Sequence, residues 1–454
     1  MKPRHTRRTF LKTTTATLAA GALARNPLIA AAGAADKPAI LGGAPVRSEP
    51  FSTVWPIFDD AEVNALTAAL HSRDWCCLRG HVVYDFQKAF AQAMGVKYCV
   101  CSNGGTTALR AALQSVGVGA GDEVITTPHT FIATINEITN LHALPVFVDV
   151  DPETGSIDAD LIEAAITENT RAILPVHLNG FPVDIEKIMD IADRCNIPVV
   201  EDACQSVFAE VNGRKVGTWG VAGCISFQEW KSLVCGEGGA LLCNDDSLHR
   251  RCAAYVNNGR DPKGEIRGYP FPGSNHRMTE FQAAILAEQF RRFKEQDSTR
   301  QKNGRYLEAA LTKIPGLTPR KRYTENTRFT YVRFELNYKR GHFVNLPAEK
   351  FAKALRAENI PFYGGLRVYS HDCPSAGMLD VHLNSRGFER VFSKARLKEY
   401  RDRLNQLDID RKAPAGEMLY MDSKIPLLAT QKEMDQIVAA FQKIAANADR
   451  IASA

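Results

Sequence analysis

Short apolar runs alternate with amphipathic segments between residues 97 and 202, and this alternation constrains the fold most strongly. Strand-like runs occupy 97–101, 123–127, 145–150, 172–177 and 198–202, and helical spacing occupies 106–116, 132–141, 158–167 and 184–195. Such a pattern is typical of βαβ units, whose parallel strands form one sheet with helices on both faces. Two later apolar runs, 221–227 and 240–243, predict a hairpin-like pair of strands. We therefore expect an α/β fold with a mostly parallel sheet.

A lysine and an aspartate stand out against this pattern. Lys231 lies in the predicted hairpin loop, and Asp202 ends the strand-like run 198–202. Chemistry that depends on pyridoxal 5′-phosphate (PLP) requires a lysine amine to hold the aldehyde and a buried carboxylate to keep the pyridine nitrogen protonated. Taken singly, a loop lysine is usually a solvated charge, and an aspartate after a strand is often a helix N-cap.

The turn at 104–106, Gly104-Gly105-Thr106, follows a strand-like run directly and opens a predicted helix. Glycines let a ligand approach the backbone closely, and the N–H groups of a helix N-terminus attract anions. This turn suits the phosphate of such a cofactor, although a glycine pair alone is often only a turn.

Together and in this order, these motifs resemble the DegT/DnrJ/EryC1/StrS family of sugar and cyclitol aminotransferases, over most of the chain after about residue 40. The resemblance implies a PLP-dependent transferase of fold type I, similar to aspartate aminotransferase. It implies a large PLP-binding domain over 35–294, ending in an amphipathic helix at 278–294, and a smaller C-terminal α/β domain over 295–454. Residues 375–412 are charged and helix-prone, and the resemblance gives them no role.

By this resemblance, Lys231 forms the Schiff base with PLP and then moves a proton between substrate and cofactor. Asp202 pairs with the pyridinium nitrogen, and Gln205 hydrogen-bonds the ring hydroxyl, unless it is only a surface glutamine. Phe131 stacks on the pyridine face, although a lone phenylalanine is more often core.

The same resemblance assigns the phosphate to Gly105, Thr106 and Ser226. Asn275 would reach the cofactor phosphate of a neighbouring subunit, so that a homodimer builds both of its sites at one interface. Glu237 and His177 also match family positions, and we interpret both as mainly structural. No metal site is expected.

The motif Ser226-Phe227-Gln228 and the opening run 41–47 most resemble the scyllo-inosose and aminohydroxybenzoate branch. This branch implies L-glutamate or L-glutamine as amino donor and a keto-sugar or cyclitol ketone as acceptor. Trp75 and Tyr84 lie in a segment expected to approach the substrate. A sugar dehydratase that uses pyridoxamine phosphate is disfavoured because such members replace the lysine with histidine. A non-catalytic, exported binding or scaffold protein of the same fold would not need Lys231 and Asp202.

The N-terminus has the features of a twin-arginine (Tat) signal peptide over residues 1–34. Arg7-Arg8 precedes a weakly apolar segment, and Ala32-Gly33-Ala34 offers a cleavage site. A disordered basic tail would explain the arginines, but it would not explain why an apolar segment and a small-residue cleavage site follow them in this order. The Tat machinery would export the folded protein to the periplasm or the cell exterior.

The net charge of +5 arises from this segment, because the first 35 residues hold six basic residues and no acid. The remaining surface is nearly neutral overall, so we expect no nucleic-acid partner. The chain has 11 cysteines. Their spacing is typical of neither zinc sites nor thioredoxin-like motifs, and several lie in apolar runs, so we expect them to pack as small hydrophobic residues.

Overall fold

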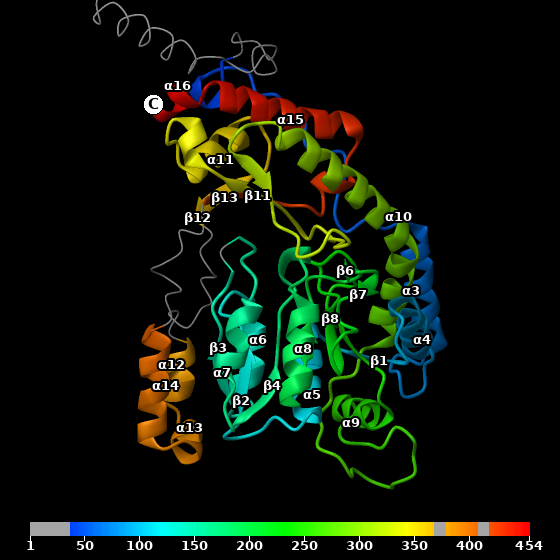
Figure 1. Cartoon of the computed structure of the whole chain (residues 1–454). Helices are drawn as coiled ribbons and strands as arrows, with labels where there is room; N and C mark the ends of the chain where they lie inside the picture. Colours follow the sequence, from blue (N-terminus) through cyan, green and yellow to red (C-terminus); the bar gives the residue numbers. More distant parts are fainter. Residues whose placement is uncertain (1–36, 152, 367–377, 407–416) are drawn as a thin grey trace, which may run out of the picture.

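A central sheet of parallel strands with one antiparallel member organises the larger part of the molecule (Figure 1). The computed structural model describes residues 37–151, 153–366, 378–406 and 417–454. The predicted signal peptide lies outside the described residues. The strands of the central sheet are β1 (Tyr98–Ser102), β2 (Glu123–Thr126), β3 (Leu144–Phe147), β4 (Thr170–Ile173), β5 (Val200–Asp202), β8 (Ala222–Ser226) and β9 (Gly239–Cys243).

Within this sheet the strand order is β1-β9-β8-β5 and then β4-β2-β3. Parallel bridges from Ile173 to Val199 and from Val176 to Asp202 join the two groups. Only β9 runs antiparallel to its neighbours, and it pairs with β8 as the predicted hairpin. The mostly parallel α/β sheet is thus confirmed.

Alternating side chains of the strands enter two hydrophobic cores, one on each face of the sheet. In β1, Cys99 and Cys101 join the core that contains α4 (Val82–Met94) and α8 (Ile185–Cys195). Val100 joins the opposite core, with α5 (Gly105–Ser115) and α9 (Asp246–Val256). All ten cysteines in the described part of the chain are free, and most are buried. Helix α6 (Ile132–Thr139) packs beside α5.

The predicted helix at 158–167 is shorter than expected. It consists of a 3-10 turn, η2 (Ala159–Leu161), and one turn of helix, α7 (Ile162–Ala165). The side chain of Asp158 caps the turn by accepting from the Asp160 amide. The chain is already extended at Ile166, which ends α7 and returns the backbone toward β4.

Helix α10 (Glu280–Leu311) is longer than the predicted helix at 278–294 and connects the two parts of the molecule (Figure 1). It starts at a capping box in which Thr279 and Gln282 exchange hydrogen bonds. The predicted domain boundary at residue 294 falls inside this continuous helix. None of the described helices is long and apolar enough to span a membrane.

A second, antiparallel sheet forms the C-terminal part, in the order β10-β11-β13-β12. Helices α11 (Ala348–Ala357) and α15 (Gln431–Ala446) share its hydrophobic core. Ile40, Leu41, Val46 and Phe51 also pack against this core, although the sequence placed residues from 35 onward in the large domain. The strands are β10 (Leu317–Pro319), β11 (Arg333–Tyr338), β12 (Tyr363–Leu366) and β13 (Glu417–Asp422).

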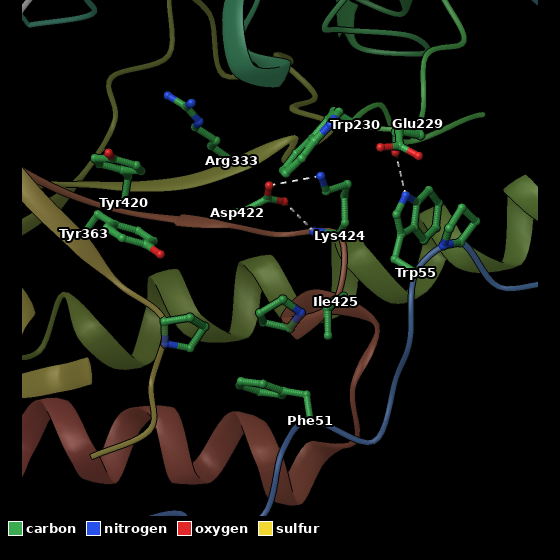
Figure 2. A pocket seen from close by; sticks show the side chains of 13 residues that line it. Phe51, Trp55, Glu229, Trp230, Arg333, Tyr363, Tyr420, Asp422, Lys424 and Ile425 are labelled. Atoms are coloured by element: carbon green, nitrogen blue, oxygen red, sulfur yellow. Dashed lines mark hydrogen bonds and ion pairs between the residues drawn. The ribbon is translucent and has the colours of Figure 1, made fainter. Parts of the chain in front are cut away.

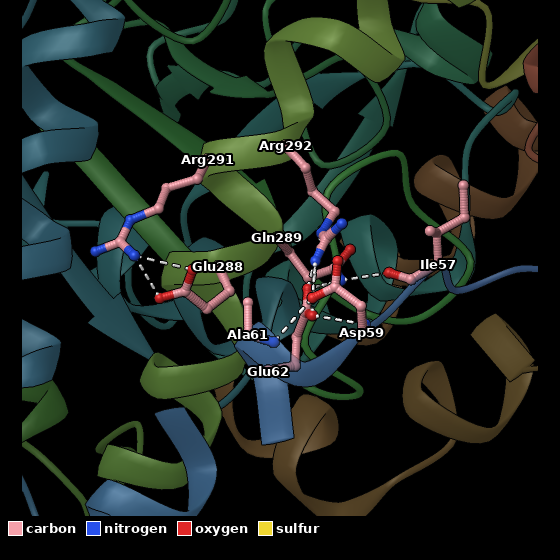
Figure 3. Close-up of polar contacts among 8 residues, drawn as sticks. All are labelled: Ile57, Asp59, Ala61, Glu62, Glu288, Gln289, Arg291 and Arg292. Atoms are coloured by element: carbon pink, nitrogen blue, oxygen red, sulfur yellow. Dashed lines mark hydrogen bonds and ion pairs between the residues drawn. The ribbon is translucent and has the colours of Figure 1, made fainter. Parts of the chain in front are cut away.

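Helix α3 (Asp60–Ser72) is fixed to α10 by a polar cluster (Figure 3). Arg292 donates two hydrogen bonds to the Glu62 carboxylate, of 2.9 and 2.8 Å, and Gln289 donates a third of 2.7 Å. Glu62 also accepts from the Asp59 amide, which completes a capping box at the start of α3. This bidentate pair orients the start of α3 on α10.

Residues 378–406 cover the edge of the central sheet. Helices α12 (Met378–Leu383), α13 (Arg386–Val391) and α14 (Lys394–Gln406) share a small hydrophobic core with Leu144 and Phe147 of β3 (Figure 1). The Tyr400 hydroxyl donates a 2.7 Å hydrogen bond to the carbonyl of Pro145. An exposed strand edge invites pairing with other chains, and these helices protect that of β3. The described part of the charged segment at 375–412 therefore has a structural role.

Candidate active site

A cavity of about 510 Å³ lies where the carboxyl ends of β5 and β8 meet the N-terminus of α5. The sequence placed eight residues in the site, and the structure brings seven of them to this cavity. They are Gly105, Thr106, Phe131, Asp202, Gln205, Ser226 and Lys231. Ligand sites of open α/β sheets lie at such strand ends.

Asp202 is the last residue of β5, and its carboxylate is almost completely buried. One oxygen accepts a 2.7 Å hydrogen bond from the Thr134 hydroxyl, and the other accepts 3.1 Å from the Cys204 amide. In the described residues no cation lies within ion-pair distance of it. Because a buried carboxylate requires a compensating charge or full hydrogen bonding, Asp202 is suited to a cationic ligand group.

Lys231 lies in the loop between β8 and β9, which backbone hydrogen bonds hold closed. The Phe227 amide donates to the Gly238 carbonyl at 2.8 Å, and the Lys231 amide donates to the Gln228 carbonyl at 2.9 Å. Burial lowers the pKa of the Lys231 ammonium, and it outweighs the opposing effects of Cys204 and Asp202. The nearby cations Lys424 and Arg333 lower this pKa further. An amine with a lowered pKa is a better nucleophile and base near neutral pH.

The N-terminus of α5 faces the same cavity, and no side chain of the described residues caps it. Its first residue, Gly105, packs so closely that an added Cβ would lie 2.8 Å from the Ser226 Cβ and 2.9 Å from the Cys204 Sγ. Gly239, at the start of β9, is equally constrained, because a Cβ there would lie 2.3 Å from the Gly104 carbonyl carbon. Because the N–H groups at a helix N-terminus and the helix dipole attract anions, this end of the cavity is suited to an anion.

Of the other residues predicted to bind the cofactor, Phe131 and Gln205 line the cavity and Asn275 does not. The Phe131 ring is 56% exposed at the cavity, so it is not the core phenylalanine of the alternative interpretation. Gln205 accepts a 3.1 Å hydrogen bond from the Asn179 amide, which fixes its side chain at the cavity wall. Asn275 is exposed and does not line the cavity of its own chain. Its predicted contact with a neighbouring subunit stays a prediction.

His177 is fully buried, with its Nε2 3.0 Å from a Glu201 oxygen and its Nδ1 accepting from the Val183 amide. These contacts agree with the structural role predicted for it. Glu237, predicted to be structural, lines the cavity instead. Trp75 and Tyr84, expected near the substrate, line neither this cavity nor the one beside it within the single chain.

A second cavity of about 630 Å³ adjoins the first and shares Trp230, Arg333 and Asp422 with it. Figure 2 shows its aromatic walls, which include Trp55, Tyr363 and Tyr420. The Trp55 indole donates a 2.8 Å hydrogen bond to the Glu229 carbonyl, two residues before Lys231. Sequence reasoning missed these residues, because they come from segments far apart in the chain.

The first cavity fits PLP group by group. The uncapped α5 N-terminus would hold the phosphate, Asp202 the ring nitrogen, Phe131 one ring face and Lys231 the aldehyde carbon. When bound, PLP supplies an electron sink for a substrate carbanion, and Lys231 then holds or moves the proton at the substrate carbon. The fold and this cavity define the class of PLP-dependent transferases of fold type I.

Comparison with known proteins narrows the class. The profile of the DegT/DnrJ/EryC1/StrS aminotransferase family matches residues 56–371. An L-glutamine:2-deoxy-scyllo-inosose aminotransferase of Micromonospora echinospora is 32% identical over 424 residues, which cover 90% of this chain and 98% of that protein. A GDP-perosamine synthase of Caulobacter vibrioides is 41% identical over 242 residues, covering 53% of this chain and 64% of that protein.

Among solved structures, a 3-amino-5-hydroxybenzoic acid synthase is similar with a TM-score of 0.70 and 26% identity, covering 90% of this chain and 99% of that one. The chain belongs to the DegT/DnrJ/EryC1/StrS aminotransferase family. It is a PLP-dependent aminotransferase.

Proposed function

We propose that the enzyme moves an amino group from L-glutamine or L-glutamate to a cyclic ketone, of the keto-sugar or cyclitol class. The observation that carries this proposal is the convergence of Lys231, Asp202 and the α5 N-terminus on one cavity. This geometry occurs in a chain of which 90% aligns with an enzyme named for L-glutamine and 2-deoxy-scyllo-inosose, and the alignment covers 98% of that enzyme. Residues 226–228, Ser226-Phe227-Gln228, support the same branch.

Two other functions are less well supported. The intact Lys231 argues against a dehydratase. A scaffold protein would not need a buried carboxylate at Asp202 that forms no ion pair within the described residues. A nucleotide-linked keto-sugar is the competing acceptor, because of the likeness to the GDP-perosamine synthase. That likeness covers only 53% of this chain, so we favour the cyclitol ketone.

Turnover by the purified, cofactor-loaded enzyme tests the proposal. L-glutamine or L-glutamate should convert the cofactor to its amine form, with release of one 2-oxoacid per site. Addition of 2-deoxy-scyllo-inosose or scyllo-inosose should then restore the aldehyde form and yield an aminocyclitol detectable by mass. If only a nucleotide-linked keto-sugar restores the aldehyde form, the acceptor class is wrong. If neither amino acid reacts, the donor assignment fails.

The active form is proposed to be a homodimer with shared sites. Asn275 is exposed outside its own cavity, as a residue that serves a neighbour would be. Exposed large apolar side chains lie on α3 and in the segments just before and after it, and single chains rarely expose many such side chains together. They include those of Phe58, Val63, Leu66, Leu70, Trp75, Leu78 and Tyr84.

Export through the Tat machinery, to the periplasm or the cell exterior, is also part of the proposal. Arg7-Arg8, the apolar segment and the small-residue site at 32–34 support it. The Tat route carries folded proteins, so PLP would be inserted before export.

A further inference from the structure

The wall between the two cavities carries a guanidinium group that the chemistry at Lys231 does not use. Arg333, at the start of β11, lines both cavities. It lies close enough to Lys231 to affect that amine electrostatically. Arg333 belongs to the C-terminal sheet, whereas the α5 N-terminus lies beside the central sheet.

Two cations, Lys424 and Arg333, line the second cavity, and within the described residues only Lys424 has a carboxylate partner. The Lys424 ammonium forms a 3.1 Å ion pair with Asp422 and lies 3.8 Å from the centre of the Trp230 ring (Figure 2). The Arg333 guanidinium lies 5.1 Å from the centre of the Tyr420 ring. Within the described residues, no carboxylate lies within ion-pair distance of Arg333.

An arginine fixed by an aromatic ring and left without a counter-ion at a cavity wall is suited to a carboxylate ligand. Its planar fork binds a carboxylate through two parallel hydrogen bonds, and the ring contact limits the conformational freedom lost on binding. Exposed arginines are usually solvated, but this one faces the cavities that hold Lys231 and the aromatic walls.

The two substrates of the proposed reaction differ in charge. L-glutamine and L-glutamate both carry a carboxylate on the carbon that bears the amine, whereas a cyclitol ketone carries no charge. The cofactor phosphate has its own donors at α5. We propose that Arg333 binds a carboxylate of the amino donor and so determines that α-amino acids serve as donors. This inference rests on the proposed function and adds a residue for the donor.

Arg333→Gln tests the inference, with Arg356→Gln as a matched control. Arg356 also lies over a tyrosine of the second cavity, 5.1 Å from the Tyr363 ring centre. Its guanidinium donates to the Phe362 carbonyl, and it lines neither cavity. Both variants therefore lose one arginine–tyrosine contact, and only Arg333→Gln also loses the proposed donor site.

Two measurements are made on cofactor-loaded protein. Calorimetry gives the dissociation constant of succinate, a dicarboxylate that cannot react, and single-turnover kinetics give the donor and acceptor half-reactions separately. Arg333→Gln should weaken succinate binding and raise the half-saturating L-glutamate concentration about 10- to 100-fold, as expected for a charged hydrogen-bonded pair. Arg333→Lys should recover part of the loss, and the acceptor half-reaction should keep its half-saturating concentration.

Donor and succinate affinities equal to those of the wild type in Arg333→Gln would overturn the inference, as would an equal loss in Arg356→Gln. A loss confined to the acceptor half-reaction would instead assign Arg333 to the acceptor. In each of these outcomes the wild-type enzyme still transfers amino groups, so the proposed function stands. Failure of the wild type to react with either amino acid is a different result and concerns the proposed function.

Discussion

The Thr134 hydroxyl donates a 2.7 Å hydrogen bond to Oδ2 of Asp202, and both side chains are buried. Thr134 lies in the first turn of α6, three residues after Phe131. The start of this one helix therefore positions both the Phe131 ring at the cavity and the hydroxyl that supports the carboxylate. The hydrogen bond fixes the orientation of the Asp202 carboxylate in the absence of any ion pair among the described residues.

Thr134→Val should preserve the fold and slow amino transfer about tenfold. The substitution is close in shape but removes the hydrogen bonds of the hydroxyl to both Asp202 and Thr130. Loss of a hydrogen bond to a charged group costs about 1.5–3 kcal/mol when the partner stays buried. The donor half-reaction measured in single turnovers checks this, with Asp202→Asn as the variant that removes the charge itself and should slow transfer far more. A Thr134→Val rate equal to that of the wild type would show that Asp202 needs no such support.

Glu433 joins the segment 47–52 to α15 and should make stability depend on pH. Its carboxylate accepts from the Ser52 amide at 2.8 Å and from the Ser52 hydroxyl at 2.7 Å, and it pairs with Arg47 at 3.3 Å. Burial raises the pKa of the Glu433 carboxyl, but hydrogen bonds from Thr430 and Ser52 outweigh this effect and bring the pKa to about 2.

A carboxyl group whose pKa is lower in the folded than in the unfolded protein stabilises the fold. This stabilisation is complete at pH values above the unfolded-state pKa, and it is lost as the pH falls through the folded-state pKa. Glu433→Gln should therefore lower stability at pH 7 by about 3 kcal/mol, and the difference from the wild type should shrink between about pH 4.5 and 2. Urea unfolding across this range measures it. The exposed Glu349→Gln serves as control, and a pH-independent difference would contradict the assignment.

If Asn275 serves the neighbouring subunit, two inactive variants should complement each other. Lys231→Ala and Asn275→Ala homodimers should each lack most of their activity. A mixed dimer places both changes in one site and leaves the other site native, so refolded mixtures should recover up to about a quarter of wild-type activity. Mixtures as inactive as the separate variants would show that Asn275 acts in its own chain or not at all.

The twin-arginine hypothesis predicts that Arg7→Lys with Arg8→Lys keeps the precursor in the cytoplasm although the charge is unchanged. A simple basic tail would tolerate the exchange, because only its charge would matter. Cell fractionation, with cofactor absorbance measured in each fraction, distinguishes these outcomes. Wild-type amounts of the double variant outside the cytoplasm would refute the twin-arginine interpretation.

The central sheet was predictable because most of its strands are short, apolar and separated by helical periods, as in 144–147 and 222–226. Lys231, Asp202 and the glycine turn were predictable because each lies beside a strand end, and parallel strands bring their ends to one edge. The length of α10 was underestimated, because the second half of the helix, from about residue 295, is largely polar and its pattern shows no clear apolar face.

The second cavity could not be predicted in the same way. Trp55, Trp230 and Arg333 come from three distant segments, and only the packing of the C-terminal sheet beside the Lys231 loop brings them together. The periodicity of apolar residues indicates which face of a helix or strand is buried, but it does not indicate which loops lie next to each other in the fold. The sequence indicates a role for Thr134 only weakly: a threonine one helical turn after Phe131 is expected on the same side of the helix as Phe131.

Mapping of the cofactor attachment tests the central claim most directly. The purified protein is treated with borohydride, digested and examined by mass spectrometry, with Lys231→Ala treated in parallel. The account predicts a single modified peptide, with the cofactor on Lys231, and no modified peptide from a folded Lys231→Ala protein. A modified peptide that lacks Lys231, or undiminished modification of the variant, would contradict it.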